Sequence, residues 1–198
     1  MVAVLVVIII LAISALTSNQ PSNNPADKKV VTFGFDNEDP LLIETQGTPL
    51  NQTSNGVTAY FSSPSDTQAA STFSIRSLSS TFLQLSSFSG KYLHDNNNSS
   101  DILEIKLSID VRELNITFAT VEQGGLLNET SKIVAASYKN TNLVDTTAIS
   151  GTFNTDTYPQ GVLYVNPGKA FNLVRVSIPT QTSGTTDFLV DNIVVTYS

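Results

Sequence analysis

The sequence predicts an all-β protein built as an antiparallel β-sandwich or jelly roll. Apolar and polar residues alternate over many short segments, and clusters rich in Asn, Gly, Pro and Ser separate these segments. No window of ten or more residues beyond the N-terminal apolar run has a helical period. About ten short strands in roughly 170 residues are typical of two packed sheets.

The clearest strand covers residues 103–111, where Leu, Ile and Val alternate with Glu, Lys, Ser and Asp. Similar patterns predict further strands at residues 30–35, 57–62, 73–77, 81–85, 114–118, 132–138, 148–153, 162–165, 171–178 and 188–197. Turn signals lie between them at Asn55-Gly56, Ser89-Gly90, Gly124-Gly125, Asn166-Pro167-Gly168 and Ser183-Gly184. No shift in composition and no repeat divides residues 30–198, so we expect one domain there.

The final strand changes parity in its middle. Phe188 and Val190 occupy one face, whereas the next apolar residues, Ile193 and Val195, belong to the other parity. A β-bulge at Asp191-Asn192 restores a single buried face. The alternative is that the two apolar sets face opposite sides of the strand.

The chain begins with an apolar run over residues 2–16, interrupted only by Ser14. As a helix it rises about 22 Å, which is short of the roughly 30 Å of a bilayer core. We therefore expect residues 1–16 to be a signal peptide or an N-terminal membrane anchor, which would contact the membrane if it is not cleaved. Residues 17–29 carry no periodic apolar face and are predicted to be a polar linker.

Composition excludes several functions. The net charge is −7 with only 10 basic residues, which argues against binding to nucleic acid. The absence of Cys excludes disulfides and thiolate chemistry. Ser and Thr make up almost a quarter of the chain and charged residues only 14%, the balance of a β-rich protein exported to the cell surface or outside the cell.

Several segments together resemble a known group of proteins. They are VTFGFDN near the start, GKYLHDNNNSSDILEIKLSIDVRELNITFATVE in the middle, then DTYPQGVLYV, FNLVRVSI and the closing DFLVDNIVVTYS. Together they resemble exported prokaryotic surface domains with a galactose-binding-like jelly-roll fold. The resemblance covers roughly residues 30–198 and implies the fold and the surface location; sugar binding follows only by analogy of fold.

The sequence gives no support for an enzyme. His94 is the only histidine, and no nucleophile elbow, second histidine or phosphate-binding loop accompanies it. His94 stands beside an Asn-rich run, where a solvated loop position is expected.

Calcium is the better chemical hypothesis, because it prefers carboxylate, amide and carbonyl oxygens. One candidate site combines Asp36, Asn37 and Asp39, next to Glu38, with Asp191, if the first and last strands lie together. A second cluster spans residues 95–101, without EF-hand spacing. The alternative for both is an ordinary Asx-rich turn.

Three tyrosines next to turns, Tyr92, Tyr138 and Tyr158, could stack on a sugar ring; the alternative for each is a half-buried strand end. The sequons at Asn97, Asn98 and Asn128 are the candidate glycosylation sites, whereas the sequon at Asn115 lies within a strand. The sequence thus predicts a non-catalytic binding or adhesion module for a glycan or a surface protein. The alternative is a structural subunit of a surface filament or layer, assembled through the N-terminal apolar helix.

Overall fold

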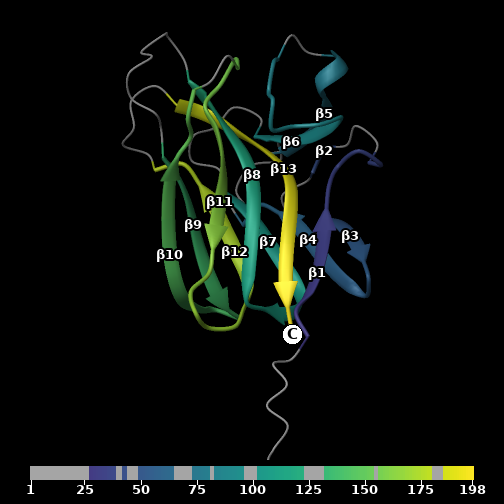
Figure 1. Ribbon diagram of the computed structural model, residues 1–198, viewed down its shortest axis with the longest axis vertical. Coiled ribbons are helices and arrows are strands. Elements are labelled where there is room, and N and C mark those ends of the chain that lie inside the picture. The colour runs from purple at the N-terminus through teal and green to yellow at the C-terminus, as the bar shows by residue number, and fades with distance from the viewer. Residues whose placement is uncertain are drawn as a thin grey trace, which may run out of the picture.

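The structure, a computed structural model, describes residues 27–38, 42–43, 49–64, 73–80, 83–95, 102–122, 132–153, 156–179 and 185–198. These residues form two antiparallel sheets that pack face to face around an apolar core (Figure 1). The all-β sandwich is confirmed, and the jelly-roll connectivity stays a prediction. The N-terminal helix, the anchor or signal peptide and most of the linker lie outside the described residues.

The first sheet has seven strands in the order β11-β8-β13-β6-β5-β2, and β1 also pairs with β13. Its strands are β1 (Lys29–Phe33), β2 (Leu42–Ile43), β5 (Phe73–Ser77), β6 (Lys91–Asp95), β8 (Glu113–Glu122), β11 (Gln160–Val165) and β13 (Thr185–Tyr197). A short 3-10 helix, η1 (Leu78–Ser80), follows β5. The pairing of β1 with β13 confirms that the first and last strands lie together.

The second sheet has six strands in the order β10-β9-β12-β7-β4-β3. They are β3 (Leu50–Ser54), β4 (Val57–Ser62), β7 (Ile102–Val111), β9 (Lys132–Lys139), β10 (Asn142–Ser150) and β12 (Phe171–Ser177). Only Arg112 separates β7 from β8, yet these two strands lie in opposite sheets. Among the described residues, no helix is long and apolar enough to cross a membrane.

The alternation in the sequence explains the core. In β7, Leu103, Ile105 and Leu107 are buried while the residues between them face outward. Inward residues of both sheets meet in one cluster, where Phe35 packs edge-on against Phe61 at a centroid distance of 5.5 Å. Burial of such a two-sided apolar layer is the main stabilising contribution.

The predicted bulge in β13 is confirmed. The pairing of β13 with β8 shifts between Val190 and Ile193, so Asp191 and Asn192 together take the space of one residue. Val190 and Ile193 are both fully buried as a result.

A second apolar cluster covers the outer side of the seven-stranded sheet at one end. Leu85 and Phe88 pack there on Tyr92, Ala119 and Leu189. The predicted strand at residues 81–85 is wrong within the described part, because residues 83–85 carry no strand and instead bring Leu85 into this cluster.

Other strand predictions also need correction. Strands β2, β3 and β6 were not predicted. The strand expected at residues 148–153 is the end of β10, which runs from Asn142 to Ser150. The Asn55-Gly56 signal is confirmed as a two-residue hairpin turn between β3 and β4, with φ of 49° and 79°.

Candidate functional site

Two predicted calcium ligands, Asp36 and Asp191, lie at one turn. Asp36 Oδ1 accepts a hydrogen bond from the Lys91 amide at 2.7 Å, and Asp191 Oδ2 accepts one from the Ser89 amide at 3.0 Å. Gly90 stands between these amides with φ of 57°. The two carboxylates therefore fix the turn that leads into β6.

Asp191 is only 2% exposed, and this burial raises its pKa to about 6. The bond from the Ser89 amide lowers the pKa, whereas the nearby Asp36 carboxylate raises it. The side-chain amide of Asn192 also lies 3.3 Å from Asp191 Oδ2. The group thus titrates in the mildly acidic range.

The structure describes only one of the other two predicted calcium ligands. Asn37 lies at a separate pocket, and Asp39 lies outside the described residues. Within the described ranges, no group of three or more acidic or histidine side chains could hold a metal ion. Each of the two carboxylates already accepts a hydrogen bond from a backbone amide. A calcium ion bound between them stays a prediction. In the second cluster, only the backbone of Asp95 is described, in β6.

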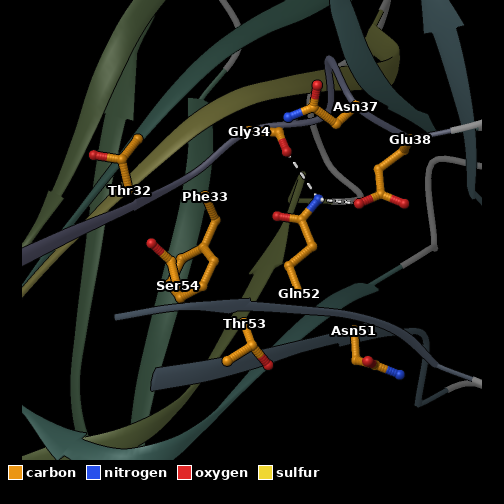
Figure 2. Close-up of a pocket in the computed structure, with 9 residues that line it drawn as sticks. All are labelled: Thr32, Phe33, Gly34, Asn37, Glu38, Asn51, Gln52, Thr53 and Ser54. Carbon is orange, nitrogen blue, oxygen red and sulfur yellow. Dashed lines mark hydrogen bonds between the residues drawn. The ribbon is translucent and has the colours of Figure 1, made fainter. Parts of the chain in front are cut away.

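A polar pocket of about 410 Å³ lies between the edge strands β1 and β3 (Figure 2). Gln52 points into it and donates its amide hydrogens to the Gly34 carbonyl at 2.8 Å and to Glu38 Oε1 at 3.1 Å. The lining is otherwise Thr32, Phe33, Asn37, Asn51, Thr53 and Ser54. The Gln52 bonds tie the end of β1 to the opposite sheet.

The three predicted tyrosines occupy different environments. Tyr92 is 1% exposed and packs edge-on against Phe88, so its prediction as a sugar-stacking residue is wrong. Tyr158 is half-buried and packs against the second apolar cluster. Tyr138 is half-buried on the outer face of the six-stranded sheet, where the Arg175 guanidinium carbon lies 5.1 Å from its ring centroid.

Tyr138 belongs to a straight row of side chains across all six strands, which we call the tyrosine row. The strand register places each residue of the row opposite the next one on the neighbouring strand. From β3 to β10 across the sheet, the row is Asn51, Tyr60, Lys106, Leu173, Tyr138 and Leu143. Tyr60 and Tyr138 stand three strand spacings apart, about 14 Å. Tyr60 was not singled out from the sequence, although it is an outward residue of the predicted strand 57–62.

An ion pair lies beside the tyrosine row. Arg175 Nε donates to Glu104 Oε2 at 2.9 Å, and the register pairs these two residues directly. Partial burial, the largest single influence, lowers the pKa of the Arg175 guanidinium, but the hydrogen bond and the negative charge of Glu104, together with Tyr138, outweigh it and raise this pKa. Glu104, Lys106 and Arg175 therefore present hydrogen-bonding groups between the two tyrosines.

The remaining predicted positions are resolved as follows. His94 lies in β6 and is half-buried, edge-on to Tyr92 at 6.4 Å, so the expected solvated loop position is wrong. Asn97, Asn98 and Asn128 lie outside the described residues. Asn115 lies in β8 as predicted and is half-buried.

No protein-family model matches the chain, and neither does any curated protein. Similar solved structures include the K1 cleaved adhesin domain of Lys-gingipain from Porphyromonas gingivalis W83, at 8% identity and TM-score 0.47, covering 86% of this chain and 99% of that one. Isomalto-dextranase from Arthrobacter globiformis T6 has 11% identity and TM-score 0.43, covering 85% of this chain and 32% of that one. A carbohydrate-binding module of family 29 has 13% identity and TM-score 0.36, covering 86% of this chain and 89% of that one.

Proposed function

We propose that the chain is a non-catalytic binding module, displayed on a cell surface or secreted, that binds a glycan along the tyrosine row. The observation that carries the proposal is the row itself: Tyr60 and Tyr138 lie in line across the strands, with charged side chains between them. A sugar chain laid across the strands can follow this line.

The chemistry of the row suits a sugar. A pyranose ring has a C–H face that packs against an aromatic ring and a rim of hydroxyls that donate and accept hydrogen bonds. Tyr60 provides the aromatic ring that packs against the sugar, because the guanidinium of Arg175 already lies over the ring of Tyr138. Lys106 and Arg175 donate to hydroxyl oxygens, and Glu104 accepts from hydroxyl hydrogens. The Arg175–Glu104 bond holds both groups in place before a ligand arrives.

The proposal is tested by binding of the full chain to a glycan array, followed by titration of the oligosaccharide that binds best. We expect Tyr60→Ala and Arg175→Ala each to weaken binding about tenfold or more, which corresponds to about 1.4 kcal/mol. Tyr164→Ala is the matched control, because Tyr164 is an exposed tyrosine on the other sheet. Equal binding by wild type and Tyr60→Ala, with unchanged melting temperatures, would contradict the proposal.

A further inference from the structure

The polar pocket between β1 and β3 stands at one end of the tyrosine row. Asn51 belongs to both, because it is the β3 member of the row and also lines the pocket. The register sets Asn51 directly opposite Tyr60 of β4, one strand spacing away, about 4.8 Å. A chain of sugars that extends from Tyr60 toward β3 therefore reaches the rim of the pocket.

Strand β3 forms the rim between the outer face and the pocket. It is the last strand of the six-stranded sheet, and among the described strands it pairs only with β4. Asn51 and Gln52 project to opposite sides of β3, as successive residues of a strand do (Figure 2). The free edge of β3 also presents backbone N–H and C=O groups, which bond readily to hydroxyls. A sugar chain can thus turn over this edge from the outer face into the pocket.

The hydrogen bonds of Gln52 decide which of its amide atoms faces the pocket. The Gly34 carbonyl and Glu38 Oε1 are both acceptors, so the N–H groups of Gln52 are directed at them. The carbonyl oxygen of Gln52, Oε1, is therefore left for the pocket. Within the described residues, this oxygen and Oε2 of Glu38 accept no hydrogen bond. The pocket thus offers acceptors to a ligand that donates hydrogen bonds, as a sugar hydroxyl does.

Glu38 gives the pocket a negative charge. It is the only charged side chain among the described residues that line the pocket. Lys91 donates to the backbone carbonyl of Glu38 from outside the lining, and the carboxylate of Asp36 accepts from the backbone amide of Lys91. Two carboxylates therefore stand against one ammonium group around the pocket. A sugar with its own carboxylate or sulfate would meet repulsion there.

The middle of the tyrosine row has a different charge balance. Lys106 lies opposite Tyr60, and Arg175 forms an ion pair with Glu104. Two cationic side chains and one carboxylate tolerate an acidic sugar over the middle of the sheet, whereas the pocket does not. Selection against negative charge is therefore confined to the end of the glycan that enters the pocket.

We propose that the polar pocket holds the terminal residue of the glycan on the tyrosine row, and that this residue is an uncharged sugar. This assignment rests on the proposed function, because the row supplies the rest of the contact. The pocket volume of about 410 Å³ lies within the range of small-molecule sites, about 300 to 1,000 Å³, and has room for a sugar ring. The module then binds the ends of glycan chains and not the middle of a long polymer.

The test uses the uncharged oligosaccharide that binds the full chain best on the glycan array, together with two acidic forms of it. In one form the CH2OH group of the sugar at the non-reducing end is oxidised to a carboxylate, and in the other that of the sugar at the reducing end. Titration calorimetry measures the affinity of each. We expect one acidic form to bind at least about fivefold more weakly than the parent, which corresponds to about 1 kcal/mol, and the other to bind within about twofold of it.

Glu38→Gln supplies the second arm. It removes the charge and keeps a side-chain oxygen that accepts from Gln52. In this variant the weakened acidic form should bind within about twofold of the parent. Asp145→Asn is the matched control, because it removes one negative charge from β10 at the opposite edge of the same sheet, and it should keep the wild-type discrimination. Melting temperatures verify that both variants fold.

The outcomes distinguish the pocket from the row. Equal affinity of the wild type for all three forms, with binding weakened in Tyr60→Ala, would overturn the assignment of the pocket and leave the proposed function standing. Discrimination that persists in Glu38→Gln would do the same, as would a wild type that binds acidic glycans alone. If the wild type binds no glycan, or if Tyr60→Ala binds as the wild type does, the pocket assignment falls together with the proposed function.

Discussion

Asp36 and Asp191 accept hydrogen bonds from the amides on the two sides of Gly90. Asp36 follows the first strand and Asp191 lies in the bulge of the last, so three distant parts of the chain meet at one turn. The Asp191 carboxyl is buried, and its burial raises its pKa.

Stability should depend on pH through Asp191. Its pKa is about 6 in the folded protein against an ordinary 3.8, so between these values the folded state holds a proton that the unfolded state has released. Raising the pH from 4 to above 6 therefore removes stability, at most about 3 kcal/mol. Urea unfolding at pH 4.5 and 7.5 measures it. Asp191→Asn should flatten this dependence, while Asp145→Asn, at an exposed position, should keep it.

The calcium prediction is tested at the same pair. An ion bridging Asp36 and Asp191 would stabilise the folded state by about 2.7 kcal/mol at a hundredfold excess over Kd. The melting temperature should then rise in millimolar calcium, fall in chelator and lose this dependence in Asp191→Ala. If the wild type melts at the same temperature in calcium and in chelator, no calcium ion binds there, and the two carboxylates only accept hydrogen bonds from the turn amides.

Substitution of two glycines by alanine distinguishes the cost of backbone strain from the cost of a side-chain clash. Gly56 and Gly90 both have positive φ, but a Cβ on Gly56 meets nothing within 4 Å, whereas one on Gly90 would lie 2.0 Å from Asp36 Oδ1. Gly56→Ala should cost about 1 kcal/mol from strain alone. Gly90→Ala should cost clearly more, because Asp36 must give up the Lys91 amide. Chemical unfolding of both variants decides it, and equal losses would mean that Asp36 moves aside freely.

The domain boundary is testable directly. We expect residues 30–198 to fold without the preceding segment, because the described core draws only on residues after position 30. Circular dichroism of this fragment should show β structure and a cooperative melt. Helical content above about a quarter, near that of ordinary mixed domains, would contradict the sandwich.

Local pattern was enough to predict much of the fold. The strands Val57–Ser62 and Phe73–Ser77 were predicted with their observed bounds, and the parity change at Asp191 located the bulge. Alternation is a property of neighbouring residues, so it can be read without knowing the partner strand. Strand β3 escaped because Leu50–Ser54 is an edge strand with no fully buried residue, and its sequence is mostly polar.

The candidate site depended on information that a single segment does not contain. Glu104 and Arg175 are 71 residues apart, and only the register of β7 with β12 sets them opposite each other. Tyr92 was misjudged for a related reason: it is buried in an apolar cluster that includes Ala119 and Leu189, and these residues come from strands far away in the sequence.

The pairing of β1 with β13 has a mechanical consequence. Lys29 is paired with Tyr197, so the chain enters and leaves the domain at adjacent points of one sheet (Figure 1). A force pulling these two points apart acts across the strands and loads their hydrogen bonds one after another, as a zipper opens. Strand β1 would then peel away at low force and draw Val31 and Phe33 out of the core.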